Sequence, residues 1–475
     1  MESSGGHNGH ANMPSANMGS KTIGECLAEF CVKLRWGDLP EEVIGYAKLL
    51  LLDLLGAALA GVETAEVKSG IAAVKIFGSA GGPSTLWGTA LHSAPAHAAF
   101  INGIAAHAQE LDDFGGVDHS GAVVVPALLA IGEALPPVTG KRLLEAMVVG
   151  YEAGRRVLEA AGGYRAHNNA SGWHSTGTCG SFGAAAAAAK VLGMDARKTT
   201  WAIGLAGTFT GGTWAFIKDG AMSKRYHAGR AAETGVVAAC LARSGFTGPA
   251  HIFESDWGGF FQTYAKGQAQ PARLTEDLGR NFKIMRSGIK PYASCRDIHS
   301  TLDVILDGRR DQGLRPEDID RVEVRCIPEM KQMLGEKAQP STRLEAQLSL
   351  AYSVAVALAA GRASLAEYEE PWLSDPFVRA LAQRVNLVVD PGLPFDSEPH
   401  VSIVTRDGRV IQGHVDFARG APENSLSRVE VEEKFERLAG MALPPGQVRE
   451  LKQMVSAVEA VEDIREITRL LARLN

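Results

Sequence analysis

The feature that most constrains the fold is a long stretch in which small and apolar residues recur at helical spacing. After residue 20 this pattern continues for about 240 residues, with no clear strand-like alternation. Within it, residues 183–192 read GAAAAAAKVL, and side chains this short allow neighbouring helices to approach closely. The same spacing is found in residues 95–110, 122–135 and 141–160. We therefore expect a large helical domain over residues 21–270.

The pattern changes after this domain. Residues 321–327 (RVEVRCI) and 400–415 alternate like strands, and Asp407-Gly408 between two β-rich runs is a strong hairpin signal. Residues 343–360 between them predict a helix. We expect a smaller α+β domain over residues 271–420. The predicted fold class is therefore mostly α, a large all-helical domain with a second, smaller α+β domain.

The two ends of the chain differ in character. Residues 421–475 return to charged amphipathic helices, which we expect to pack back on the helical domain. Residues 1–20 are polar and rich in Gly, Asn and Ser, without the basic start and apolar core of a signal peptide, so we interpret them as a disordered tail. The most apolar stretch, residues 47–61, carries Lys48 and Asp53 and is too short to span a bilayer.

Composition narrows the possible partners. A formal net charge of −6 gives no electrostatic footprint for nucleic acid or for an anionic membrane, so we expect neither as a partner. The six cysteines form no CxxC pair, which argues against a zinc ribbon and favours reduced thiols in the cytoplasm. An anionic ligand would have to be attracted by a local cluster of positive charge.

Four polar islands interrupt the apolar pattern. Imidazoles, carboxylates and ammonium groups are costly to place near a core unless they are paired or functional. Four such islands on one chain predict a single pocket for a small anionic molecule. The islands are residues 107–121 (HAQELDDFGGVDHSG), 172–176 (GWHST), 221–230 (AMSKRYHAGR) and 290–300 (KPYASCRDIHS).

The first island allows two kinds of chemistry. A carboxylate at Asp112 could orient an imidazole such as His119 for proton transfer. Alternatively, His107, Glu110, Asp112 and His119 could bind a metal in a metal-dependent hydrolase, although a second carboxylate–histidine pair of matching spacing is missing. A helix end followed by a solvated loop is the structural alternative.

The other islands supply cations and imidazoles. His174 precedes a Gly- and Ser-rich helix start, a place where free backbone N–H groups bind anions. Helical spacing places Lys224 and His227 on one face of a helix. The third and fourth islands also contribute Arg225, Lys290, Tyr292 and His299. The Gly-rich segment 207–214 lacks the features of a nucleotide-binding loop, so we predict no nucleotide cofactor.

In this order, and over nearly the whole chain after residue 20, these stretches resemble the MmgE/PrpD family. That family includes 2-methylcitrate dehydratase, cis-aconitate decarboxylase and iminodisuccinate epimerase. The matching stretches are LPEEVIGYAKLLLLDLLGAALAG (39–61), NGIAAHAQELDD (102–113), HSGAVVVPALLAIGEA (119–134), WHSTGTCGSFGAAAAAAKVLG (173–193), MSKRYHAGRAAETGVVAACLARSGFTGP (222–249) and KPYASCRDIH (290–299).

The resemblance implies a helical domain completed by the C-terminal helices, a smaller α+β domain, a homodimer, and an active site between the domains that uses no metal or other cofactor. Two departures from the family pattern leave the substrate open. His119 is followed by Ser120 where family members commonly have proline, and the loop FGGVD lacks the usual Thr or His. The family's catalytic positions correspond to Asp112, Asp113, His119, His174, Lys224 and His299.

The family's reactions share one difficulty, the build-up of negative charge on a carbon next to a carboxylate, which fixed cations and hydrogen-bond donors can stabilise. We expect Lys224 to anchor a carboxylate or act as an acid, and His174 and His299 to transfer the proton. Asp112 and His119 would orient the substrate or a histidine. The expected substrate-binding residues are Asp113, Arg225, His227, Lys290 and Tyr292.

The sequence favours a metal-independent, dehydratase-type lyase that acts on a small di- or tricarboxylate resembling 2-methylcitrate. An epimerase of an iminodisuccinate-like acid and a decarboxylase of the cis-aconitate type are close alternatives. From other classes, the metal-dependent hydrolase and a non-catalytic helical binding protein stay open. The binding protein would leave the four islands apart.

Overall fold

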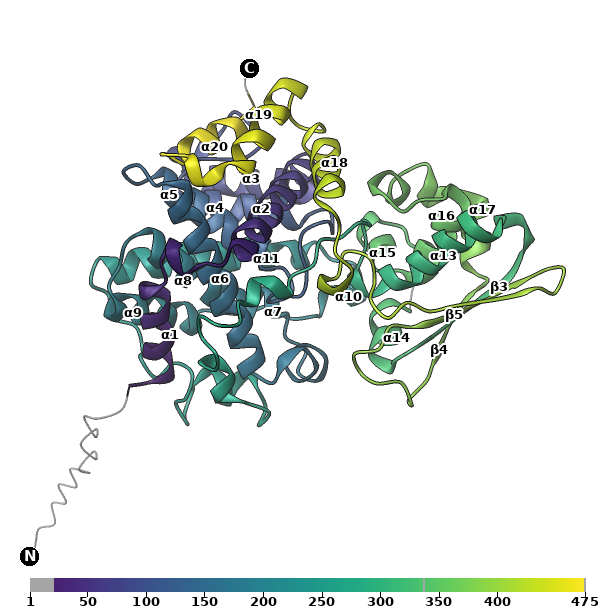
Figure 1. Ribbon diagram of the computed structural model, residues 1–475, viewed down its shortest axis with the longest axis horizontal. Helices are drawn as coiled ribbons and strands as arrows, with labels where there is room; N and C mark the ends of the chain where they lie inside the picture. The colour runs from purple at the N-terminus through teal and green to yellow at the C-terminus, as the bar shows by residue number, and fades with distance from the viewer. Residues whose placement is uncertain (1–20, 336–337, 474–475) are drawn as a thin grey trace, which may run out of the picture.

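The computed structural model describes residues 21–335 and 338–473, so the predicted tail at residues 1–20 lies outside the described residues. Figure 1 shows a large body of helices beside a smaller body in which helices cover a sheet. The predicted fold class, mostly α with a smaller α+β part, is confirmed.

The large body begins with helices whose first turns carry side-chain caps. Thr22 and Glu25 form a capping box at the start of α1, and Thr139 caps α6. A small antiparallel pair, β1 (Ala80–Thr85) and β2 (His92–Ser93), interrupts the helices. The helices are α1 (Ile23–Lys33), α2 (Glu41–Gly61), α3 (Ala65–Ile76), α4 (Pro95–His107), α5 (Gly121–Glu133), α6 (Gly140–Ala160), α7 (Ser175–Thr178), α8 (Gly180–Val191), α9 (Ala196–Thr208), α10 (Phe216–Asp219), α11 (Ser223–Arg243) and α12 (Phe260–Tyr264).

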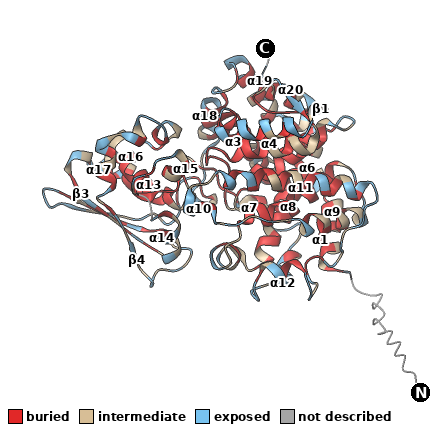
Figure 2. Cartoon of the chain, turned by 180° about the vertical axis from the view of Figure 1, so that it is seen from behind, coloured by how far each residue is buried: buried red, intermediate tan, exposed pale blue. Residues whose placement is uncertain are grey.

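Small residues set how closely these helices pack. Every residue of α8 is buried, and this helix packs against α5, α6, α9 and α11. A Cβ added at Gly183 would lie 2.6 Å from the carbonyl oxygen of Gly150, and one at Gly235 would lie 2.3 Å from the Cβ of Ala184. In Figure 2 the inner helices of this body are almost uniformly buried. The Ala run is therefore a packing device, as its composition indicates.

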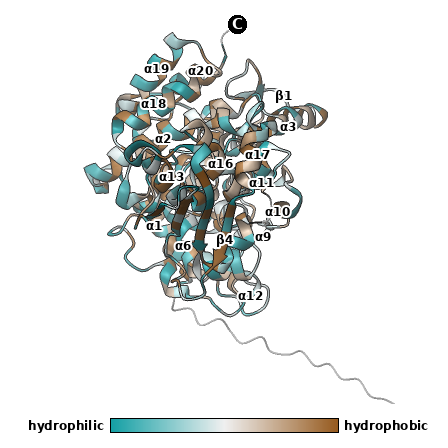
Figure 3. Cartoon of the chain, turned by 90° about the vertical axis from the view of Figure 1, so that its right-hand side faces the viewer, coloured by the Kyte–Doolittle hydropathy of each residue, from teal (hydrophilic) through white to brown (hydrophobic). Residues whose placement is uncertain are grey.

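The smaller body has a four-stranded sheet of order β4-β3-β5-β6, in which β3 runs parallel to β4 and antiparallel to β5. The predicted hairpin at Asp407-Gly408 is present, since β5 and β6 pair around it. Figure 3 views this body from its own side and shows hydrophobic residues along the sheet. Its elements are α13 (His299–Gln312), β3 (Ile319–Cys326), α14 (Pro328–Leu334), α15 (Arg343–Gln347), α16 (Leu350–Ala360), α17 (Pro376–Ala382), β4 (Val385–Val389), β5 (His400–Thr405) and β6 (Val410–Gly413).

One predicted helix of this body is divided. The prediction of a single helix over residues 343–360 was wrong, because α15 ends at Gln347 and α16 begins at Leu350. Ser349 has an extended backbone, and its hydroxyl accepts a hydrogen bond from the backbone N–H of Tyr352. A serine at this position competes with helix continuation by capping the next helix.

The C-terminal helices α18 (Arg428–Ala439), α19 (Pro445–Ser456) and α20 (Arg465–Leu471) return to the large body. They lie on it in Figure 1, where α18 runs beside α2. A buried ion pair joins these two helices, because Lys434 Nζ lies 2.6 Å from Asp53 Oδ1. The same ammonium donates a hydrogen bond of 2.7 Å to the carbonyl oxygen of Leu111, directly before the acidic residues of the first island.

Helix α2 is longer than its most apolar part, residues 47–61, because it begins at Glu41. It spans 21 residues, so by length and composition alone it is long and apolar enough to cross a membrane. However, 72% of its most apolar window is buried inside the protein. Burial against neighbouring helices, rather than shortness, explains its apolar character.

We predict that Lys434→Met destabilises the protein. The substitution leaves the Asp53 carboxylate buried without its cation, and breaking a buried ion pair costs about 3–5 kcal/mol. The double variant Asp53→Asn/Lys434→Met should recover part of the loss. Urea unfolding of the three proteins measures both effects, and a single variant as stable as the wild type would contradict the prediction.

Candidate active site

The loop between α4 and α5, residues 108–120, supplies most of the acidic groups. Helix α4 ends at His107, as the sequence predicts, and the chain then turns through two non-glycine residues with positive φ, Glu110 (54°) and Asp118 (98°). Such conformations are uncommon and concentrate at functional sites. Glu110 and Asp112 are fully buried, so the loop points its charges into the protein.

Asp112 binds two imidazoles. Its carboxylate lies 3.0 Å from His107 Nδ1 and 2.9 Å from His119 Nδ1. Burial alone would raise the pKa of Asp112, but the two imidazoles outweigh it and lower that pKa well below its usual range. Burial works against the charged form of His119, yet Asp112 and Asp118 together raise the pKa of His119. His119 is therefore suited to carry a proton near neutral pH.

His174 belongs to a second group of imidazoles. It directly precedes α7, and its Nδ1 atom lies 2.9 Å from Nδ1 of His227. Its Nε2 atom lies 3.3 Å from Asp118 Oδ2. Burial lowers the pKa of His174 to about 4 and that of His227 to about 3. Both imidazoles are therefore neutral at physiological pH, which allows one to donate the shared hydrogen bond to the other.

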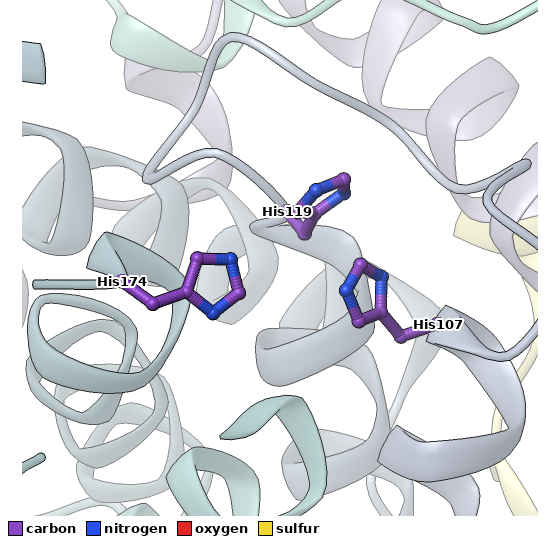
Figure 4. A group of neighbouring side chains, drawn as sticks. All are labelled: His107, His119 and His174. Carbon is purple, nitrogen blue, oxygen red and sulfur yellow. The ribbon is translucent and has the colours of Figure 1, made fainter. Parts of the chain in front are cut away.

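The imidazoles of His107, His119 and His174 come from separate segments and gather around one space (Figure 4). One ring nitrogen of each lies within 4.8 Å of the others, so this trio could hold a transition metal ion. This trio differs from the four residues considered for a hydrolase. Glu110 contacts cations instead, and Asp112 is occupied by the Nδ1 atoms of two histidines. The same arrangement serves acid–base chemistry directly.

Glu110 is surrounded by three cations. Its carboxylate accepts hydrogen bonds from Lys224 and Arg225, in the first turn of α11, and from Lys290 Nζ at 3.0 Å. All four side chains are buried. Burial would raise the pKa of Glu110, but the three cations lower it well below its usual range. Three positive charges facing one negative charge leave a buried excess of two, which would attract an anionic ligand.

Asp113, Tyr292 and His299 lie apart from the cluster around Glu110. Asp113 Oδ1 accepts a hydrogen bond of 2.8 Å from the backbone N–H of Gly121 at the start of α5. Tyr292 donates a hydrogen bond of 2.7 Å to Asp303 Oδ1 and lies edge-on to the ring of His299. His299 Nε2 donates to the carbonyl oxygen of Ser294 at 3.2 Å.

The structure brings together residues of all four islands but not every predicted pair. Seven predicted site residues belong either to the imidazoles and carboxylates around Asp112 and Asp118 or to the cations around Glu110. They are Asp112, His119, His174 and His227 in the first group and Lys224, Arg225 and Lys290 in the second. Among the described residues, no contact joins His174 to His299, so direct proton exchange between these two finds no geometric support. The Nδ1 atom of His299 is buried without a hydrogen-bond partner.

A cavity of about 330 Å³ opens between the two bodies next to this site. The large body contributes Phe114, Asp118 and Tyr164 to its wall, and the smaller body contributes Met330 and Phe395. Its volume is in the range of small-molecule sites. Asp118 links the two features, because its carboxylate lies on the cavity wall and also contacts the imidazoles behind it.

Comparison with known proteins agrees with this architecture. The profile of the MmgE/PrpD N-terminal domain matches residues 25–272, and that of the C-terminal domain matches residues 292–460. The chain belongs to the MmgE/PrpD family. The C-terminal match includes α18 and α19, which pack on the large body in the structure.

The similar curated proteins are cis-aconitate decarboxylases. The human cis-aconitate decarboxylase is 30% identical over 467 residues, covering 95% of each chain. The cis-aconitate decarboxylase of Aspergillus terreus is 27% identical and covers 94% of this chain and 95% of its own. A cis-aconitate decarboxylase-like protein of Aspergillus oryzae is 28% identical, covering 94% of this chain and 98% of its own.

Three residues of the site were not predicted as site residues. His107 and Glu110 were considered only as metal ligands, although His107 binds Asp112 and Glu110 organises three cations. Asp118 was not considered at all. The sequence carries a signal for Glu110, because buried cations in the third and fourth islands need a buried counter-charge. It also carries one for Asp118, a carboxylate that directly precedes His119 in the same loop.

We predict that folding stability depends on pH through Asp113. Burial, together with the Asp112 carboxylate, raises the pKa of Asp113 from 3.8 to about 7. Between these values the folded chain keeps a proton that the unfolded chain has lost, so stability falls as the pH rises from 4 to 7. Relative to Asp113→Asn, the free energy of unfolding of the wild type should fall by on the order of 2–4 kcal/mol across that pH window.

Urea unfolding at pH 5 and pH 7.5 measures this difference. Asp416→Asn is the matched control, because the side chain of Asp416 is 89% exposed and its replacement should leave the pH dependence of the wild type in place. Parallel pH profiles for the wild type and Asp113→Asn would contradict the assignment.

Proposed function

We propose that the protein is a lyase that acts on a small di- or tricarboxylate, and that its reaction is the decarboxylation of a cis-aconitate-like acid. The observation that carries the proposal is the buried excess of positive charge around Glu110 beside a group of imidazoles and a cavity of small-molecule size. The relatives that match over at least 94% of this chain are named as cis-aconitate decarboxylases or as cis-aconitate decarboxylase-like. Their names favour the decarboxylase over the dehydratase that the sequence favours.

The chemistry of the step fits the groups available. The carboxylate that can leave as CO₂ is the one on the CH₂ group next to the C=C double bond. Its C–C bond breaks, and the electron pair spreads through the double bond onto the conjugated carboxylate. Lys224 and the neighbouring cations would stabilise that charge. His119, whose pKa is raised, would donate a proton to the carbon and recover one from water. The neutral His174 would serve as a hydrogen-bond partner for the substrate.

The predicted outcome is CO₂ release from cis-aconitate and the loss of this activity in site variants. His119→Gln and Lys224→Met should each lower kcat at least about 100-fold, since a positioned acid or charge contributes that much or more. His251→Gln is the matched control, because the His251 side chain is 71% exposed and its replacement should leave turnover unchanged.

The assay should include citrate, 2-methylcitrate and iminodisuccinate, followed by proton NMR in deuterated water. Net loss of water from citrate or methylcitrate without CO₂ would identify a dehydratase. Exchange of a proton without net product would identify an epimerase. Turnover of none of these acids, or full turnover by the His119 variant, would contradict the proposal. Activity that requires stoichiometric metal would instead favour the hydrolase.

We also propose that the protein forms a homodimer, as the family resemblance implies, and that the outer face of α11 forms its interface. Met222, Tyr226, Val237 and Leu241 on this helix are all at least 40% exposed. Two apolar hollows of about 410 and 310 Å³ flank the helix and share Arg230 and Glu233. A contiguous exposed apolar surface of this kind marks an interface, and a salt bridge at its centre can be repeated across a two-fold axis.

We predict that the wild type sediments as a dimer of twice the 50.3 kDa chain mass and that Val237→Glu shifts it towards monomer. The introduced carboxylate would be buried without a partner in the interface. Val410→Glu, at an exposed apolar position of the smaller body, is the matched control. Analytical ultracentrifugation at micromolar concentration measures the masses, and a monomeric wild type would contradict the proposal.

A further inference from the structure

The Asp118 side chain contributes to the raised pKa of His119, but the proposed reaction assigns it no contact with the substrate. Its Oδ1 atom lies 3.5 Å from His119 Nε2 and its Oδ2 atom lies 3.3 Å from His174 Nε2. The two oxygens of one carboxylate are thus shared between two imidazoles. The same two imidazoles could bind the carboxylate of a ligand in the same way, with one oxygen facing each ring.

Asp118 also separates these imidazoles from the cavity. The rings of His119 and His174 are at least 96% buried, and neither residue lines the cavity of about 330 Å³ between the bodies. Asp118 does line this cavity, and its side chain is 13% exposed. A ligand that enters the cavity therefore meets the Asp118 carboxylate before it can reach the imidazoles.

The backbone shows that this position is held by its contacts. Asp118 has φ = 98°, a region that residues with a side chain rarely adopt. A conformation of this kind is unfavourable and persists only where surrounding contacts hold it. The side chain contacts the two imidazoles and forms a hydrogen bond with the Tyr164 side chain. A competing ligand on the imidazoles would remove the first two of these contacts.

The neighbouring backbone is fixed, so the movement required is local. Phe114 pairs with Gly288 through two backbone hydrogen bonds of 3.1 and 2.8 Å. The backbone N–H of Val117 donates to Ser120 Oγ at 2.9 Å. Rotation of the Asp118 side chain into the cavity would clear the imidazoles while these anchors keep the loop in place.

We propose that the Asp118 carboxylate is an internal occupant of a carboxylate subsite formed by His119 and His174, and that a carboxylate of the ligand displaces it. The ligand class is a small polycarboxylate, a choice that rests on the proposed function. Asp118 thereby lowers the affinity of the site for every ligand that must displace it. The site thereby selects acids whose other carboxylates bind the cations around Glu110 strongly enough to offset the cost of displacing Asp118.

Removing the competing charge should tighten binding. Asp118→Asn keeps the shape of the side chain and tolerates positive φ, and Asp118→Gly removes the side chain and is favoured at this φ. The probe is tricarballylate, a saturated tricarboxylate without the double bond that the proposed reaction needs. We expect both variants of the full-length protein to bind it at least 10-fold more tightly than the wild type in isothermal titration calorimetry.

A double variant tests whether the gain comes from this subsite. Asp118→Asn/His119→Gln should lose the tightening, because one of the two imidazoles is gone. Unchanged or weaker binding by both single variants would overturn the proposal. Absence of binding in the wild type and both variants would overturn it as well.

The readout is independent of turnover. If no acid is converted but the single variants bind tricarballylate more tightly, the proposed function fails and the subsite is supported. If cis-aconitate is converted but the variants do not tighten, the proposed function is supported and the role of Asp118 is refuted.

Discussion

The interaction on which the site depends is the burial of Glu110 among Lys224, Arg225 and Lys290. These four side chains come from the loop after α4, the first turn of α11 and the segment that connects the two bodies. Taking one carboxylate and three cations out of water is costly unless each finds a partner, so the cluster fixes the relative positions of these segments. Arg225 extends it to Gln347 in α15 of the smaller body, whose side chain in turn donates to the carbonyl oxygen of Gln109.

The imidazoles beside this cluster, His119 and His174, differ in protonation state. Burial disfavours the charged form of both imidazoles. At His119, Asp112 and Asp118 outweigh burial and raise the pKa, whereas at His174 burial outweighs Asp118 and Lys224 lowers the pKa further. Environments that push the pKa values of like groups apart are how proteins assign acid and base roles. The charges that attract an anionic substrate thus also help to decide which imidazole carries the proton.

Much of the fold could be predicted from the sequence because it depends on local patterns. The helix expected at residues 141–160 differs by one residue at its start, since a threonine at position 139 caps it. The hairpin at Asp407-Gly408 follows from turn chemistry. The error at residues 343–360 has a local cause in Ser349, whose cap outweighs an apolar pattern that continues through it. Local signals were sufficient where no distant contact decided the conformation.

The site could be predicted only in part. The four islands contain most of the side chains of the site. Which of these side chains contact each other depends on segments far apart in the sequence, such as Glu110 and Lys224, which are 114 residues apart. The positive φ of Asp118 has no sequence signal, because the residue there is not glycine. The expected pairing of His174 with His299 illustrates the same limit, since the two residues stand on different bodies and proximity there depends on how these bodies meet.

The arrangement also explains why one family scaffold can support several reactions. Loss of CO₂, loss of water and inversion at carbon all pass through negative charge next to a carboxylate, and the cations around Glu110 would stabilise that charge in each case. What differs is the group that leaves and the face to which the proton returns. In this chain Asp118 stands on the cavity wall and contacts the imidazoles behind it. We expect both differences to depend on side chains at this wall, where substitution would leave the buried charges around Glu110 in place.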